Sequence, residues 1–213
     1  MTRAAPAENE YLREPGYSER YRDTRFSTRS GPRTDARERQ ALARLLAHPA
    51  VERGLWLDMP SGAGRLSDLL PGEVVRVDRD AQMLRAAGER LPRACASGFA
   101  LPFREGSFAG VLCMRLVQHL GERAQRIALL AELARVARGA IVVSFFDARS
   151  LQHARRVVGG AFGRRSGRAA VTRAAFADEL AAAGLEPLAT QALLRWVSEQ
   201  TLLLARPRRP SRA

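Results

Sequence analysis

The sequence contains no lysine, few cysteines and no long apolar run. A membrane-spanning helix needs about 20 consecutive apolar residues, and no stretch of the chain approaches that length. The first residues, Met1–Pro6, lack the apolar segment of a secretory signal peptide. Cys95 and Cys113 lie in or beside apolar segments, which predicts buried free thiols rather than a disulfide or a metal site. These absences predict a cytoplasmic protein with no bound metal.

Arginine supplies every basic side chain, and the formal net charge is +13 at pH 7. Replacement of all lysine by arginine is typical of the coding bias of a GC-rich genome. Such bias does not explain the excess of bases over acids, which favours an anionic partner. The length of 213 residues is enough for one α/β domain with a substantial core.

A short apolar run, Leu55–Leu57, leads into Asp58 and then into a turn of small residues. The run predicts a buried strand, and the pattern over Gly62–Leu70 predicts a helix. Gly62 and Gly64 lack a Cβ, so a ligand can approach the backbone there. A strand, a glycine turn and a helix N-terminus together form a nucleotide cradle. Because Asp58 would repel a pyrophosphate, the sequence favours a ligand that carries a positive charge.

This stretch resembles motif I of the class I S-adenosylmethionine-dependent methyltransferases, usually an acid followed by G-x-G-x-G. Pro60 stands where the first glycine usually lies, a replacement that small-molecule members often tolerate. Val77–Leu84 is similar to the family's V-D-x-S-x-x-M-L segment, and Asp78 lies twenty residues after Asp58. A carboxylate at such a strand end accepts both hydroxyls of a ribose. The resemblance places Met83 against the adenine; the alternatives are a helix-capping Asp78 and a core Met83.

The segment Ser97–Leu112 resembles the family's G-D-A-x-x-L-P-F-x-x-G-S-F-D-x-V block. Ser97 stands where an Asp usually contacts the adenine amino group, and Ala109 where an Asp usually opens the fourth strand. A neutral hydrogen bond contributes about 0.5–1.5 kcal/mol, so Ser97 predicts weaker binding rather than its loss. Ser97 and Ala109 together leave open a weak cofactor site or a degenerate enzyme. The resemblance implies S-adenosylmethionine as cofactor, held by Asp58, Pro60, Ser61, Gly62, Gly64, Asp78, Arg79, Met83, Ser97, Gly98, Phe99 and Arg115.

His119 occupies the place of the family's H-H-L or Q-H-L segment, after the fourth strand. It is the candidate catalytic residue, able to hold the acceptor or remove its proton, because histidine titrates near neutrality. The alternative is a histidine that caps a helix and packs the loop. A D/N-P-P-Y motif, typical of adenine N6 methyltransferases, is missing here. Cys113 lacks the neighbours of a cytosine C5 methyltransferase nucleophile. The candidate acceptor-binding residues are Tyr21, Phe26, Phe146 and Arg149.

Two further segments have unusual composition. Residues 1–33 hold every tyrosine of the chain, interleaved with arginine, and predict an arm or lid over the cofactor; a loosely attached arm is the alternative. Arg149–Arg173 contains seven arginines and no acid. Its glycines predict a mobile loop that recognises an anionic acceptor or surface, peripheral membrane contact included, and a solvated loop is the alternative.

The alternation of strands and helices predicts a Rossmann-like seven-stranded mixed sheet with helices on both faces and a C-terminal antiparallel hairpin. The expected methyltransferase-like domain spans residues 34–206, and residues 207–213 are expected to form a disordered basic tail. The expected activity is in-line methyl transfer to a small molecule or an envelope-associated metabolite. A non-catalytic accessory protein and an RNA methyltransferase are the alternatives. The expected elements are helices 34–48, 62–70, 80–90, 122–138 and 173–183, and strands 55–58, 74–77, 94–96, 111–114, 140–146, 185–197 and 199–205.

Overall fold

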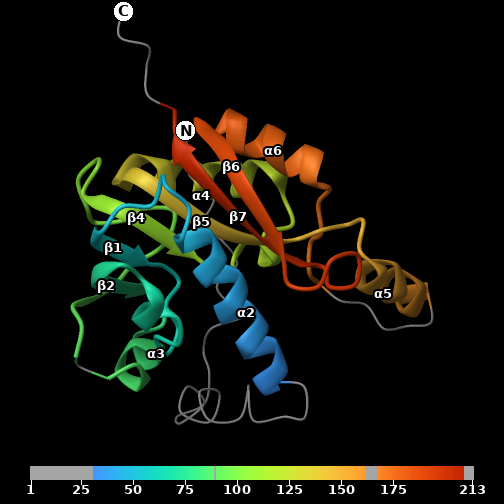
Figure 1. The fold of residues 1–213 in the computed structure, drawn as a ribbon, viewed down its shortest axis with the longest axis horizontal. Coiled ribbons are helices and arrows are strands. Elements are labelled where there is room, and N and C mark those ends of the chain that lie inside the picture. The colour runs from blue at the N-terminus through green and yellow to red at the C-terminus, as the bar shows by residue number, and fades with distance from the viewer. Residues whose placement is uncertain (1–30, 89, 162–166, 209–213) are drawn as a thin grey trace, which may run out of the picture.

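The computed structural model describes residues 31–88, 90–161 and 167–208 (Figure 1). Its helices are α2 (Gly31–Leu46), α3 (Ala81–Ala86), α4 (Arg123–Val136), α5 (Leu151–Ala161) and α6 (Arg173–Ala182), with short 3₁₀ helices η2 (Ser67–Leu69) and η3 (Val117–His119). Its strands are β1 (Gly54–Asp58), β2 (Gly72–Asp78), β3 (Arg93–Cys95), β4 (Phe108–Cys113), β5 (Ala137–Phe146), β6 (Leu185–Ala192) and β7 (Gln200–Pro207).

The strands form one seven-stranded sheet in the order β3-β2-β1-β4-β5-β7-β6. The first five strands along the chain pair in parallel, whereas β7 is antiparallel to both β5 and β6. The predicted Rossmann-like mixed sheet with a C-terminal antiparallel hairpin is therefore confirmed. The strand order reverses between β1 and β4, and in open α/β sheets ligands bind at the carboxyl ends of the strands beside such a reversal.

Helices cover both faces of the sheet, as expected (Figure 1). Alternate residues of β5 divide between two apolar clusters because side chains alternate along a strand. Val143 and Phe145 belong to the cluster under α4 and α6, where the ring of Phe145 stacks on Phe176 at 4.3 Å between centroids. Val142 belongs to the opposite cluster, which includes Leu42 of α2. The sheet is thus buried on both sides, and its ligands are confined to its edge.

The predicted helix Gly62–Leu70 is wrong. After β1 the chain forms turns and only the three-residue η2, Ser67–Leu69. Gly62 and Gly64 adopt φ values of +52° and +74°, in the left-handed region that interrupts a right-handed helix. The turn therefore leads into no long helix, and the expected helix N-terminus over Gly62–Leu70 does not contribute a dipole to the site.

The prediction of a mobile loop over Arg149–Arg173 is also wrong for part of the segment, because α5 occupies Leu151–Ala161. The hydroxyl of Ser150 accepts a hydrogen bond from the backbone N–H of His153 at 3.1 Å, as a helix cap does. Arg164 and Arg165 lie outside the described residues. The predicted cap of α6 is confirmed, since Thr172 accepts from the N–H of Ala175.

Several smaller expectations change. The chain is already helical at Gly31, where the described residues begin after residue 30, rather than from residue 34. Helix α3 ends at Ala86 rather than near residue 90, and β6 ends at Ala192 rather than Val197. Cys113 is buried as expected, whereas Cys95 is exposed. The predicted lid, with Tyr21 and Phe26, and residues 209–213 of the predicted tail lie outside the described residues.

Candidate functional site

Two carboxylates lie at the carboxyl ends of adjacent parallel strands. Asp58 is the last residue of β1 and Asp78 the last residue of β2, and both are buried. Because β1 and β2 pair in parallel, these ends meet at the same edge of the sheet. The edge lies beside the reversal of strand order, so the two acids stand where an α/β fold binds its ligand.

Asp78 holds the glycine turn in place. Its Oδ2 accepts from the backbone N–H of Gly62 at 2.8 Å, and its Oδ1 accepts from that of Asp80 at 2.9 Å. The N–H of Ser61 donates to the carbonyl of Val77 at 2.9 Å, which ties the same turn to β2. The cap of α3 is Asp80 and not Asp78, so the helix-cap alternative for Asp78 is wrong. Burial raises the pKa of Asp78, although the two backbone donors oppose that shift.

Asp58 is more deeply enclosed. The hydroxyl of Ser67 donates to its Oδ2 at 2.6 Å. Burial raises the pKa of Asp58 to about 7, against the opposing effects of the Ser67 hydrogen bond and the nearby positive charge of Arg76. Near neutral pH this group therefore exists in both the neutral and the ionised form, and a cation placed beside it would favour the carboxylate.

The space at the turn fits a ligand that approaches the backbone. A Cβ added at Gly62 would meet no heavy atom within 4 Å, so the turn is open at this point. A Cβ at Gly64 would lie 3.0 Å from the guanidinium of Arg76, and one at Gly98 would lie 2.8 Å from the sulfur of Met59. Gly62 is therefore the glycine that leaves room for a ligand, whereas Gly64 and Gly98 are required by internal packing.

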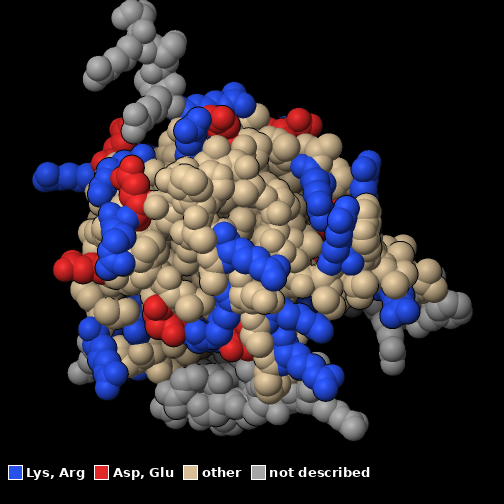
Figure 2. Space-filling model, in the orientation of Figure 1, with Lys and Arg blue, Asp and Glu red and all other residues tan. Residues whose placement is uncertain are grey.

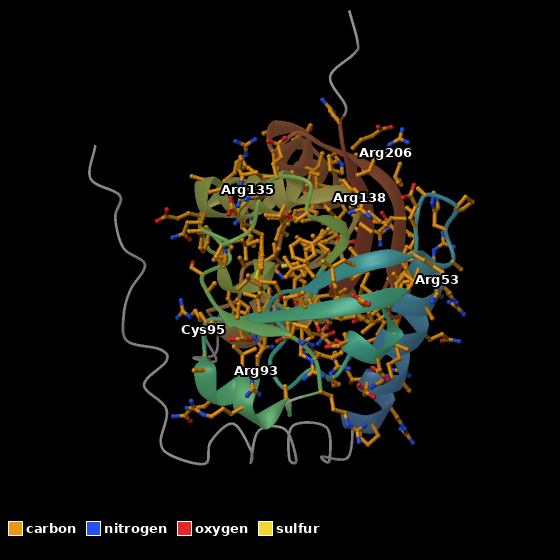
Figure 3. All side chains as sticks on the ribbon, turned by 90° about the vertical axis from the view of Figure 1, so that its left-hand side faces the viewer. Arg53, Arg93, Cys95, Arg135, Arg138 and Arg206 are labelled. Atoms are coloured by element: carbon orange, nitrogen blue, oxygen red, sulfur yellow. The ribbon has the colours of Figure 1, made fainter. Side chains whose placement is uncertain are left out.

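The expected adenine side lies at β3 and α3. Met83 is buried, and Arg79 is exposed. Ser97 is exposed, and its hydroxyl accepts from the N–H of the half-buried Phe99 at 3.3 Å. Figure 3 shows Cys95 on β3 at the same edge, above α3. The expected contacts thus surround one edge of the sheet, and the Ser97 hydroxyl already has a backbone partner.

On the acceptor side, β4 delivers Arg115 and then η3 to the carboxyl edge. Arg115 has a φ of +60°, unusual for a residue with a side chain, and its N–H donates to the hydroxyl of Ser144 at 2.7 Å. Its Nε donates to Oε1 of Glu38 at 2.8 Å. His119 ends η3 and is exposed.

Glu38 is a site residue that was not predicted. This carboxylate of α2 is fully buried and pairs with Arg65 from the glycine turn as well as with Arg115. Asp35, on the same helix, also pairs with Arg65. Helix α2 is therefore fastened both to the glycine turn after β1 and to the segment that follows β4. The pairing joins residues far apart in the chain, and no local pattern indicates it.

Two other residues were missed although the sequence held a signal for each. Ser67 stands where a third glycine would lie in a dinucleotide-binding motif, and it is the hydrogen-bond partner of Asp58. Arg76 interrupts the apolar pattern of β2, is opposite Asp58 in the register and is buried beneath the turn. Its Nη1 donates to the carbonyl of Ala87 at 2.5 Å.

Of the expected acceptor residues, Phe146 ends β5 and Arg149 follows three residues later. Phe146 is almost completely buried, and the guanidinium carbons of Arg156 and Arg168 lie 5.7 and 6.0 Å from its ring centroid. Arg149 is exposed, and its N–H donates to Asp147 at 3.0 Å. Among the residues the structure describes, no group of His, Cys, Asp and Glu is arranged to hold a metal ion.

Comparison with known families identifies the domain. The model of the family described as "Methyltransferase domain" matches residues 57–143, which span the two acids, the glycine turn and η3. These residues form a class I S-adenosylmethionine-dependent methyltransferase domain. The cofactor that this assignment indicates is S-adenosylmethionine. No curated protein matches the chain.

Solved structures support the fold of the methyltransferase domain. Magnesium protoporphyrin IX methyltransferase from Synechocystis with bound SAH is 18% identical, with a TM-score of 0.69 over 82% of this chain and 84% of that one. A S-adenosylmethionine-dependent methyltransferase from Clostridium acetobutylicum is 13% identical, with a TM-score of 0.70 over 89% and 99%. A possible histamine N-methyltransferase from Thermotoga maritima is 12% identical, with a TM-score of 0.63 over 88% and 98%. The names of the first and the third indicate unlike acceptors, so the likeness fixes the fold and leaves the acceptor open.

Proposed function

We propose that this protein transfers a methyl group from S-adenosylmethionine to a small molecule or an envelope-associated metabolite. The observation that carries the proposal is the hydrogen bond from the backbone N–H of Gly62 to the carboxylate of Asp78. One carboxylate positions the turn, and the same turn leaves open space at its glycine. A carboxylate oxygen accepts more than one hydrogen bond, so Asp78 retains capacity for the hydroxyls of a ribose.

The residues that would hold the cofactor fall into groups, and each group suits a different part of S-adenosylmethionine. Asp58, whose carboxylate is fixed by Ser67, suits the ammonium group. Asp78 suits the ribose, and the backbone at Gly62 permits close approach. Met83, Ser97 and Phe99 suit the adenine. The expected roles of Pro60, Ser61, Gly64, Arg79, Gly98 and Arg115 belong to the same proposal, with Gly64 and Gly98 acting through packing.

When bound, S-adenosylmethionine supplies an electrophilic methyl group. The contribution of the chain is alignment, for which well-oriented reactants reach effective molarities of about 10⁵–10⁸ M. The pairs of Glu38 with Arg65 and Arg115 fix the glycine turn and the segment after β4 relative to each other. His119, exposed after β4, is the candidate to hold the acceptor or take its proton. Phe146 and Arg149 would border the acceptor at the end of β5.

The RNA methyltransferase alternative loses support because arginines of the basic segment Arg149–Arg173 form ion pairs within the fold. Arg156 lies 3.1 Å from a carboxylate oxygen of Glu199, and Arg173 lies 2.7 Å from one of Asp147. These arginines therefore neutralise carboxylates of the fold itself. The non-catalytic alternative rests on Ala109 and on Ser97, whose hydroxyl accepts a hydrogen bond from the N–H of Phe99. Such a protein would bind the cofactor without turning it over.

The test is the release of S-adenosylhomocysteine when the purified full chain is incubated with S-adenosylmethionine and separate panels of acceptors. The panels are small carboxylic acids, amines and phenols, lipid extracts, and RNA. Turnover with a small molecule or a lipid-derived acceptor, weakened in His119→Ala, supports the proposal. Turnover with RNA alone contradicts the acceptor class. Cofactor binding without turnover on any panel favours the non-catalytic alternative.

A further inference from the structure

The exposed large apolar side chains of the described residues all belong to two neighbouring segments. They are Leu151, Val157 and Val158 of α5, and Leu194, Trp196 and Val197 of the connection between β6 and β7. Their exposed fractions run from 36% for Leu194 to 70% for Trp196. Scattered apolar residues are normal on a protein surface, but a contiguous group marks an interaction site. We call this group the α5–Trp196 surface.

The two segments are joined by backbone hydrogen bonds. The N–H of Leu151 donates to the carbonyl of Trp196 at 2.9 Å, and the N–H of Gln152 donates to that of Val197 at 3.0 Å. The side chain of Gln152 also accepts from the N–H of Glu199 at 3.2 Å. The start of α5 is therefore fixed against the connection, and the apolar residues form one surface. In Figure 1, α5 projects from the body of the molecule beside this connection.

Helix α5 has an inner and an outer side. Residues of an α-helix are about 100° apart, so His153 and Arg156 share one side, and Leu151, Arg155 and Val158 share the other. The inner pair is fastened to the body: Arg156 lies 3.1 Å from Glu199 and stands over the ring of Phe146. The outer three are exposed. The outer side thus combines apolar side chains with a positive charge.

The charges around this surface have one sign. Arg149, Arg155 and Arg195 are exposed, and the guanidinium of Arg195 lies 5.3 Å from the ring centroid of Trp196. Residues 148–177 and 193–198 contain no Asp or Glu. The adjoining carboxylates, Asp147 and Glu199, are buried and paired with arginines. In Figure 2 the projecting part of the molecule shows basic and uncharged residues.

We propose that the α5–Trp196 surface docks the protein onto an anionic lipid surface. A short amphipathic helix with basic residues, next to an exposed tryptophan, has the composition of a segment that lies in the interface of a membrane. Arginines with long apolar stems reach the phosphate groups while the apolar side chains enter the interface. No described helix is long and apolar enough to cross a bilayer, so the contact is peripheral.

A second copy of this chain fits the surface less well. A symmetric contact through the α5–Trp196 surface would bring Arg149, Arg155 and Arg195 of one copy against the same arginines of the other. Like charges in close contact are repulsive, and the surface offers no exposed carboxylate to relieve them. The docking proposal concerns a surface outside the cofactor cleft and does not rest on methyl transfer.

The test uses the full chain and vesicles of phosphatidylcholine, with or without 30 mol% phosphatidylglycerol (about one anionic lipid in three, a mixture that gives a negative surface potential). Binding is measured by co-sedimentation over a salt series. Trp196 is exposed and Trp56 is fully buried, so a blue shift in tryptophan fluorescence on binding reports on Trp196. We expect binding to the anionic vesicles, with this shift, and loss of binding as added salt shortens the Debye length from about 10 Å at 0.1 M to about 3 Å at 1 M.

Matched variants separate this surface from general charge. The first replaces Arg149, Arg155 and Arg195 with Gln, and its control replaces the exposed Arg44, Arg53 and Arg104 with Gln. One basic residue near an anionic surface changes partitioning about fivefold, so the first variant should bind roughly a hundredfold more weakly than wild type. The control should stay much closer to wild type. Leu151→Ser with Val158→Ser should keep the native thermal midpoint and lose the fluorescence shift.

Three results would overturn the proposal. The first is wild-type protein that does not bind anionic vesicles at low salt. The second is a control variant that loses as much binding as the variant of the α5–Trp196 surface, which would make the effect one of net charge. The third is concentration-dependent dimerisation in sedimentation velocity, abolished by the apolar variant and unaccompanied by vesicle binding, which would assign the surface to a second copy.

Discussion

Cofactor affinity should depend on pH through Asp58. Burial raises the pKa of this group to about 7, and Ser67 fixes the carboxylate by a hydrogen bond of 2.6 Å. If the ligand's ammonium group is bound by the ionised form, protonation of Asp58 removes that attraction. Affinity for S-adenosylmethionine should therefore fall as the pH drops through 7.

The size of the effect follows from the fraction of Asp58 that is ionised. With a pKa of about 7, the ionised fraction at pH 5.5 is roughly 25-fold smaller than at pH 7.5, and affinity should fall by about the same factor. Stability should change in the opposite direction. An acid whose folded pKa lies above its unfolded value of 3.8 adds stability at low pH, and this contribution is lost as the pH rises from about 4 to 7.

The measurement is calorimetric titration of S-adenosylmethionine between pH 5.5 and 7.5, with Asp58→Asn as the comparison. The Asn side chain retains an oxygen that can accept from Ser67, so the variant removes the charge and keeps this contact. Its affinity should be low and nearly independent of pH. A wild-type affinity that is flat over this range, or an equal slope in the variant, would refute the assignment of Asp58 to the ammonium group and point to another group such as a histidine.

Three further predictions concern the cleft and the core. Gly62→Ala and Gly184→Ala each place a Cβ in open space at a left-handed φ, and each should lower the free energy of unfolding by about 1–2 kcal/mol. Only Gly62→Ala should also weaken cofactor binding. Equal cofactor binding by the two variants would show that Gly62 does not contact the ligand. Ser97→Asp should strengthen binding severalfold in calorimetry, because a charge-assisted hydrogen bond is stronger than a neutral one, and no gain would mean that adenine is held elsewhere. Glu179→Gln should lower the unfolding free energy in urea by about 3–5 kcal/mol, since Arg126 would stay buried without its ion pair, and a loss below about 1 kcal/mol would contradict this.

Strands β1, β4 and β5 could be predicted from the sequence because each contains a short apolar run bounded by turn residues. The position of the candidate site followed from the predicted strands, since Asp58 and Asp78 end adjacent parallel strands and must meet at one edge. The predictions of secondary structure were wrong where backbone geometry, rather than the apolar pattern, determined the structure. The left-handed conformations of Gly62 and Gly64 prevent the helix that the apolar pattern after them predicts.

Helix α5 was missed for a different reason. Glycines in a basic segment were interpreted as mobility, although Leu151, Arg155 and Val158 have helical spacing and Ser150 supplies a cap. The pairing of Glu38 with Arg115 could not be predicted at all. These residues are 77 positions apart, and their contact depends on where α2 packs on the finished sheet.

The central claim is that S-adenosylmethionine binds at the site formed by Asp78 together with the turn at Gly62. The most direct measurement is calorimetric titration of S-adenosylhomocysteine into wild-type protein and into Asp78→Asn, with folding of both checked by thermal unfolding. The account predicts saturable binding at one site in the wild type and clearly weaker binding in the folded variant, because the amide replaces a carboxylate that accepts from Gly62 and from the ribose. Absence of binding by the wild type at millimolar ligand, or equal binding by both proteins, would contradict it.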